Sequence, residues 1–195
     1  SLGELSSKVN ISGPIEDING EILWELSEGI YPAEGKINVR NSQATIEKAI
    51  AKIGSGTLQL DGFANLENWQ ITATANRIPL AALEPLEPLG LPPNLEGIAN
   101  GRFRLAGATD NLSLNAIAGN GNATLNIAGG TAGVTGQLDN GRWEANANAS
   151  ELQLYELERI ATNAGFLPMT GETPVLRGNI FDRADGSLNF RGNFN

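Results

Sequence analysis

The chain repeats itself at an offset of 74 residues, the separation between Trp69 and Trp143. In this ungapped register nine pairs of residues are identical. They are Gly56 and Gly130, Thr57 and Thr131, Gly62 and Gly136, Trp69 and Trp143, Ala73 and Ala147, Ala75 and Ala149, Leu80 and Leu154, Leu83 and Leu157, and Glu84 and Glu158. Self-similarity at a fixed period indicates units that bury their apolar faces by stacking on their neighbours. We therefore expect a repeating architecture that builds a surface or a path.

Apolar and polar residues alternate along most of the chain. The clearest run is 143–150, in which Trp143, Ala145, Ala147 and Ala149 are separated by polar residues. This alternation places the apolar residues on one face of a strand and the polar residues on the other. A sheet with one dry and one wet face is typical of antiparallel strands, so we predict an all-β, mostly antiparallel fold. Thr72, Thr74, Asn146 and Asn148 should then face solvent.

Short turn signals separate the alternating runs. Asn-Gly and Asp-Gly supply the positive φ angles that tight hairpins need. We predict hairpin turns at Asn19-Gly20, Asn100-Gly101, Asn140-Gly141 and Asp185-Gly186. We also interpret residues 119–122 as a hairpin loop rather than a phosphate-binding loop, because neither a helix nor a lysine follows them.

Two stretches carry apolar residues three and four apart, which is helical spacing. We predict short helices near residues 79–89 and 152–164, the first of them ended early by Pro85 and the prolines that follow it. For residues 42–53 a strand is favoured over an amphipathic helix. One unit should then contain about five strands and one helix, and the chain about twelve strands or more.

We expect residues 1–195 to form one continuous repeat array. Within it, residues 1–55 are interpreted as a partial unit, residues 56–129 as a unit, and residues 130–195 as the next unit, incomplete. The chain begins at Ser1 without an initiator methionine and stops inside an alternating run. We therefore expect it to be a piece of a longer array.

Composition argues against several classes of function. The chain has neither cysteine nor histidine, which removes the commonest general base and the commonest transition-metal ligands. A net charge of −9 argues against nucleic acid, whose binding depends on Lys and Arg neutralising phosphates. We find no arrangement of residues typical of catalysis, of a metal site or of a cofactor site. No apolar run approaches the length of a membrane-spanning helix, and no signal peptide is visible.

Several motifs resemble the repetitive β region of TamB proteins. These motifs are Gly-Thr-Leu-Gln-Leu-Asp-Gly at 56–62, the alternating strand led by tryptophan at 69–76, and Ile-Pro-Leu-Ala-Ala-Leu at 78–83. The strand at 101–107, followed by Leu112-Ser113-Leu114, is similar to strands of the same family. TamB proteins are inner-membrane-anchored subunits of the translocation and assembly module and belong to the AsmA-like group. The texture, poor in charge and rich in Asn and Ala, is most similar to cyanobacterial members.

The resemblance implies an elongated, curled sheet that forms an open apolar trough, with short helices interspersed. It implies a protein of the cell envelope and periplasm, with its membrane anchor outside this stretch. The trough would conduct acyl chains of phospholipid or another lipid between the inner and outer membranes. A second implied function is assembly of outer-membrane proteins, or protein translocation, with a barrel-assembly partner of the Omp85 type.

The apolar positions themselves support an open trough. Packed sheets normally fill the space between them with branched and aromatic side chains, whereas rows of alanine leave room for an acyl chain. The predicted lining residues are Trp69, Ile71, Ala73, Ala75, Phe103, Leu105, Leu112, Leu114, Leu125, Ile127, Trp143, Ala145, Ala147 and Ala149. A narrow β-sandwich, in which the alanines face helices or bulky residues such as Trp24, remains an alternative.

Three classes of function follow from the sequence. The first is the lipid-conducting trough. The second is a scaffold whose sheet edges pair with strands of client proteins. The third is a purely structural β-array, such as the stalk of an adhesin.

Overall fold

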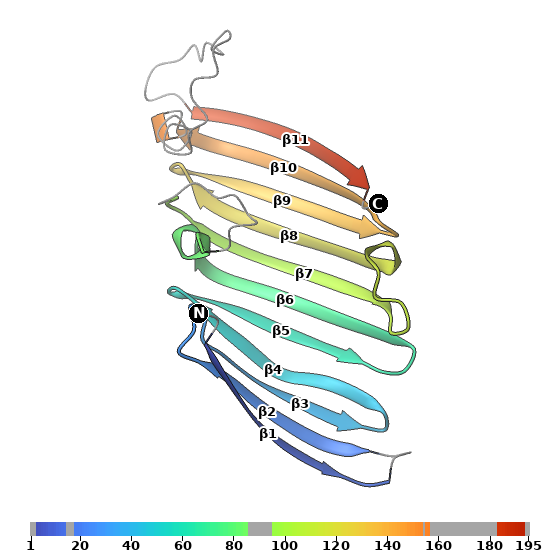
Figure 1. Cartoon of the computed structure of the whole chain (residues 1–195). Coiled ribbons are helices and arrows are strands. Elements are labelled where there is room, and N and C mark those ends of the chain that lie inside the picture. The colour runs from blue at the N-terminus through green and yellow to red at the C-terminus, as the bar shows by residue number, and fades with distance from the viewer. Residues whose placement is uncertain (1–2, 15–17, 86–94, 154, 157–182, 194–195) are drawn as a thin grey trace.

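The chain folds into a single antiparallel β-sheet of eleven strands in chain order (Figure 1). The structure is a computed structural model that describes residues 3–14, 18–85, 95–153, 155–156 and 183–193. The strands are β1 (Glu4–Ser12), β2 (Asn19–Ser27), β3 (Ala33–Arg40), β4 (Gln43–Ile53), β5 (Gly56–Ala64), β6 (Asn68–Pro79), β7 (Ile98–Ala108), β8 (Ile117–Ile127), β9 (Gly130–Asp139), β10 (Arg142–Gln153) and β11 (Arg183–Asn193). The predicted all-β, antiparallel class is confirmed.

The sheet is open and elongated. Its first strand β1 and its last strand β11 are at opposite ends of the strand order and do not pair with each other. Figure 1 shows one layer of long, arched strands, not a closed tube. Residues 43–53 form strand β4, as favoured from the sequence.

The repeat is a unit of four strands, not the five expected from the sequence. Strand β4 recurs as β8, and β6 recurs as β10, each with both bounds shifted by 74 residues. Strand β5 likewise starts 74 residues before β9. The prediction of five strands counted the segment that contains Leu112 and Leu114 as an additional strand. That segment is the connection between β7 and β8, and it includes the short 3-10 helix η3 (Leu114–Ala116).

Strands β7 and β11 complete the repeat at a different offset. Both pair with the preceding strand across the same irregularity, after Ala75 in β6 and after Ala149 in β10. Ile98 and Arg183 are the equivalent first residues, so the offset here is 85 residues. At this offset the motif Ala-Asn-Gly in β7 matches Ala-Asp-Gly in β11, and Gly107 matches Gly192. The second unit is therefore longer in the connection before its last strand.

One of the four predicted turn dipeptides forms a two-residue hairpin turn. Asn140 and Gly141 join β9 to β10, both with positive φ. Asn19-Gly20 begins β2, and the other two dipeptides lie inside β7 and β11. In β7 the Asn100 side chain has another use, because its Oδ1 accepts a 2.8 Å hydrogen bond from the backbone N–H of Arg77. Arg77 is the residue of β6 that bulges out of register, with φ of 51°.

The most buried residues gather at one end of the strands, around the 3-10 helix η1 (Leu80–Leu83). Leu80, Ile78 and Ile53 are each 6% exposed or less. The Tyr31 hydroxyl, between β2 and β3, donates a 2.7 Å hydrogen bond to the Ala82 carbonyl. Helix η1 confirms a short helix within the predicted 79–89, of which residues 86–94 lie outside the described part. Of the helix predicted at 152–164, residues 152–153 belong to β10, residues 155–156 are helical, and the remainder is not described.

Candidate functional site

The pairing register gathers the apolar residues of successive strands on one face of the sheet. Three rows of directly paired residues cross β1–β10 on this side, which we call the apolar face. The first row is Val9, Ile22, Ile37, Ile46, Gly62, Ile71, Leu105, Gly119, Leu138 and Trp143; the second is Ser7, Trp24, Gly35, Ala49, Leu60, Ala73, Phe103, Gly121, Gly136 and Ala145; the third is Leu5, Leu26, Ala33, Ala51, Leu58, Ala75, Gly101, Ala123, Val134 and Ala147. Ser7 is the one polar residue in these three rows.

The apolar face is not covered by a second layer of described residues. Each described strand makes its contacts mainly with its neighbours in the sheet, and Figure 1 shows a single layer. Phe103, Leu105 and Ile71 consequently stay 47%, 41% and 37% exposed in the middle of the molecule. An extended apolar surface of this kind marks a site of interaction in a soluble domain.

The opposite face carries amide, hydroxyl and charged side chains in equally continuous rows, and we call it the polar face. One such row is Asp61, Thr72, Arg104, Asn120, Gln137, Glu144 and Arg191. Asn189 of β11 donates hydrogen bonds to Asn146 Oδ1 at 2.6 Å and to Glu144 Oε1 at 3.1 Å. Thr72 is a correction to the solvent-facing prediction, because it is only 7% exposed between the longer side chains of its neighbours Asp61 and Arg104.

Ion pairs join the strands of the first part of the polar face. Lys36 Nζ lies 2.8 Å from Glu21 Oε2 and 3.1 Å from Glu47 Oε2, and Lys48 Nζ lies 2.7 Å from Glu34 Oε1. The hydrogen bonds to Glu21 and Glu47 raise the pKa of Lys36, and the hydrogen bond from Lys48 lowers the pKa of Glu34. These pairs are solvent-exposed, so they support register more than stability.

Twelve of the predicted lining residues lie on strands of the apolar face, and two do not. The twelve are Trp69, Ile71, Ala73, Ala75, Phe103, Leu105, Leu125, Ile127, Trp143, Ala145, Ala147 and Ala149. Leu112 and Leu114 belong to the β7–β8 connection, where Leu112 is 68% exposed. The local reason is the Asn111 side chain, whose Oδ1 accepts hydrogen bonds from the Ser113 N–H and hydroxyl and holds a turn there.

A shallow apolar notch of about 380 Å³ interrupts the apolar face over β7–β10. Its floor consists of Gly119, Gly121 and Gly136, and its walls include Phe103 and Trp143. The sequence interpretation missed this site because it took residues 119–122 for a hairpin loop, whereas they lie inside β8. The signal that could have found it is the alternation of Gly119, Gly121, Ala123 and Leu125 with polar residues.

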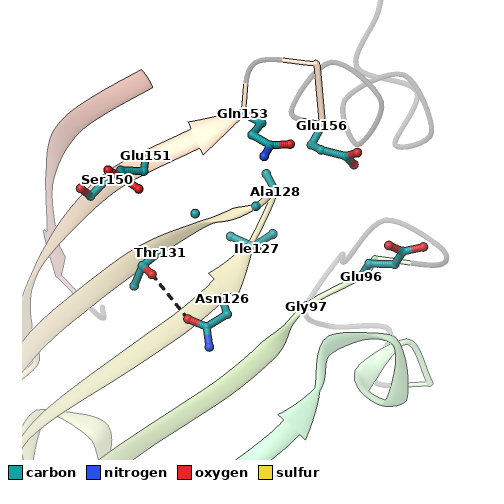
Figure 2. Close-up of a pocket in the computed structure, with 12 residues that line it drawn as sticks. Glu96, Gly97, Asn126, Ile127, Ala128, Thr131, Ser150, Glu151, Gln153 and Glu156 are labelled. Carbon is teal, nitrogen blue, oxygen red and sulfur yellow. Dashed lines mark hydrogen bonds between the residues drawn. The ribbon is translucent and has the colours of Figure 1, made fainter. Parts of the chain in front are cut away.

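A larger hollow of about 730 Å³ lies at the ends of β8–β10 (Figure 2). Asn126, Thr131 and Gln153 line it together with backbone of the β8–β9 turn, and the carboxylates of Glu96, Glu151 and Glu156 come from three separate segments. The Thr131 hydroxyl donates a long 3.5 Å hydrogen bond to Asn126 Oδ1. In the described part of the chain, no group of three or more acidic side chains is placed to hold a metal ion.

The fold and the apolar face together define a class of protein, an open antiparallel repeat sheet with one uncovered apolar side. No helix among the described residues is long and apolar enough to cross a membrane. In comparisons with known proteins, no family, no curated protein and no solved structure matches this chain.

Proposed function

We propose that this chain is part of a TamB-like protein of the cell envelope whose apolar face conducts lipid acyl chains between the inner and outer membranes. The observation that carries the proposal is the apolar face itself, which crosses β1–β10 and has no cover among the described residues. With about 4.8 Å between neighbouring strands, these ten strands provide a path of roughly 43 Å.

The chemistry of the face favours an alkyl chain over a polypeptide as the moving group. A polypeptide brings N–H and C=O groups, and burying them against side chains that neither donate nor accept hydrogen bonds costs several kcal/mol each. The three rows of the apolar face offer such a peptide the Ser7 hydroxyl as their one polar side chain. An alkyl chain has no polar group to satisfy and gains free energy from leaving water.

The wider setting of the proposal depends on the resemblance to TamB proteins. It comprises a periplasmic location, phospholipid as the cargo, and an Omp85-type barrel-assembly protein as the partner of the full-length protein. The assembly of outer-membrane proteins by strand pairing is the competing function, and the experiment below separates the two.

The test places one negative charge on either face of β10. Ala147 belongs to the apolar face, and its neighbour Asn148 is exposed on the polar face. Ala147→Asp puts a carboxylate in the path, where a passing acyl chain would strip it of water without providing a partner. Asn148→Asp is the matched control. We expect the first variant to lose photocrosslinking to phospholipid in cells and the second to keep it, with similar melting temperatures. Equal crosslinking in both variants would rule out conduction and favour the strand-pairing scaffold.

A further inference from the structure

The two repeats differ at one place on the apolar face. In the first repeat, Ile46, Gly62 and Ile71 are directly paired across β4, β5 and β6. In the second repeat, Gly121, Gly136 and Ala145 are paired in the same way across β8, β9 and β10. The central glycine is common to both repeats. Two isoleucine side chains in one repeat therefore correspond to a hydrogen atom and a methyl group in the other.

This difference accounts for the notch. Where Ile46 and Ile71 raise the surface of the first repeat, Gly121 and Ala145 leave a hollow bounded by Phe103 and Trp143. The hollow is open above Gly136, because a Cβ built on that glycine would come no closer than 3.5 Å to any other heavy atom. The space is thus vacant by sequence and is not the result of a poorly packed side chain.

We propose that this notch is a holding seat for one acyl chain, and that Gly121 and Ala145 are the positions that create it. The proposal rests on the proposed lipid function and adds that the path has a preferred stopping place in the second repeat. The notch is lined by apolar atoms, and the polar side chains of β8–β10 project from the opposite face. Its occupant must be uncharged and free of unsatisfied hydrogen-bonding groups, and an alkyl chain meets both conditions.

The first variants exchange residues between the repeats. Ala145→Ile installs the residue of the first repeat and fills the notch, and Ile71→Ala opens the corresponding place in the first repeat. Asn148→Ile is the matched control, because it adds the same side chain to the same strand on the polar face. None of the three positions is among the buried core, so all three variants should fold.

The probe is palmitic acid with a photoreactive diazirine in its chain, added to the purified chain, with the crosslinked residues located by peptide mass spectrometry. In the unaltered chain we expect crosslinks concentrated on β8–β10 around Gly136. Ala145→Ile should weaken binding by roughly ten-fold and remove that concentration of crosslinks. Ile71→Ala should produce new crosslinks around Gly62, and Asn148→Ile should change nothing.

Each other outcome is decisive. Crosslinks spread evenly along the apolar face, and lost in Ala147→Asp, would overturn the seat and leave lipid conduction standing. An unchanged pattern in Ala145→Ile would overturn the assignment of that position. The absence of crosslinks above those of Ala147→Asp would overturn both the seat and the proposed function.

Discussion

Glycines 56 and 130 recur in the repeat because the backbone of the next strand leaves no room for a side chain. A Cβ on Gly56 would lie 2.5 Å from the Arg77 carbonyl oxygen, and one on Gly130 would lie 2.5 Å from the Ser150 carbonyl oxygen. Arg77 and Glu151 are the equivalent bulged residues of β6 and β10, with φ of 51° and 57°. The bulge brings the backbone close, and only glycine accommodates it.

Alanine substitution should therefore have opposite effects at two glycines. We expect Gly56→Ala to destabilise the chain by about 1–3 kcal/mol, because its methyl group would overlap backbone that cannot move freely. Gly133→Ala, where no atom lies within 4 Å of the added Cβ, should be neutral or stabilise it by up to about 1 kcal/mol. Urea denaturation measures both, and equal destabilisation of the two variants would show that the close approach at Gly56 is not what matters.

Glu144 should make stability depend on pH on the acid side. Hydrogen bonds from Asn189 and then Gln137 hold its pKa below the ordinary value of 4.5. A carboxylate with a depressed pKa stabilises the folded state above its unfolded pKa, and this stabilisation is lost as the pH falls through the lower folded value. The urea midpoint should therefore decrease less between about pH 7 and about pH 3 in Glu144→Gln than in the unaltered chain. Parallel curves for the two proteins would contradict this assignment.

At the scale of elements, helix η1 closes one end of the strands and supplies most of the core. The backbone N–H of Leu80 donates a 2.9 Å hydrogen bond to the Gly97 carbonyl and so links η1 to the start of β7. Leu80, Ile78 and Leu95 are 5%, 5% and 7% exposed, in a molecule whose strand centres are mostly half-exposed. The single layer is thus anchored along this rim.

Truncation at the rim should cost far more than the same truncation elsewhere. We expect Leu80→Ala to destabilise the chain by about 2–4 kcal/mol, because it removes a buried side chain and leaves a cavity. Leu66→Ala is the matched control, since Leu66 is 81% exposed in the turn between β5 and β6. Thermal unfolding of both variants tests this, and a Leu66→Ala effect as large as that of Leu80→Ala would place the anchor elsewhere.

At the scale of the whole molecule, stability should vary along the strand order. Each described strand makes its contacts mainly with its sequence neighbours, as in a one-dimensional array. Strand β1 pairs with β2 alone, and all nine of its residues are exposed. Strand β6 has neighbours on both sides and contacts η1. Local opening in such an array begins where neighbours are fewest.

Hydrogen exchange followed by mass spectrometry should show this gradient. We expect the backbone amides of Glu4–Ser12 to exchange well before those of Asn68–Pro79. The β8–β9 hairpin, which has paired strands on both sides, serves as an internal reference and should behave like β6. Uniform protection from β1 to β10 would indicate one cooperative unit instead of an array.

Much of this architecture could be predicted from the sequence. The run from Trp143 to Ala149 predicted its own face correctly because a strand has a fixed period of two, and a one-residue error would have exchanged the faces. The repeat was predicted from Trp69 and Trp143, which occupy equivalent strands. The alternation did not predict the notch, because glycines in 119–122 carry no apolar side chain and resemble a turn.

The alternation and the 74-residue offset by themselves determined an antiparallel repeat sheet with one dry face, since side-chain direction in a strand is a local property of the backbone. Tertiary structure alone decided that Asn100-Gly101 lies inside β7, because its role depends on the bulge at Arg77, more than twenty residues away in the chain. It also decided that the unit has four strands and that Gly121 and Ala145 face Phe103 across a hollow. Pairing partners and depth depend on which strands become neighbours, and no local pattern carries that information.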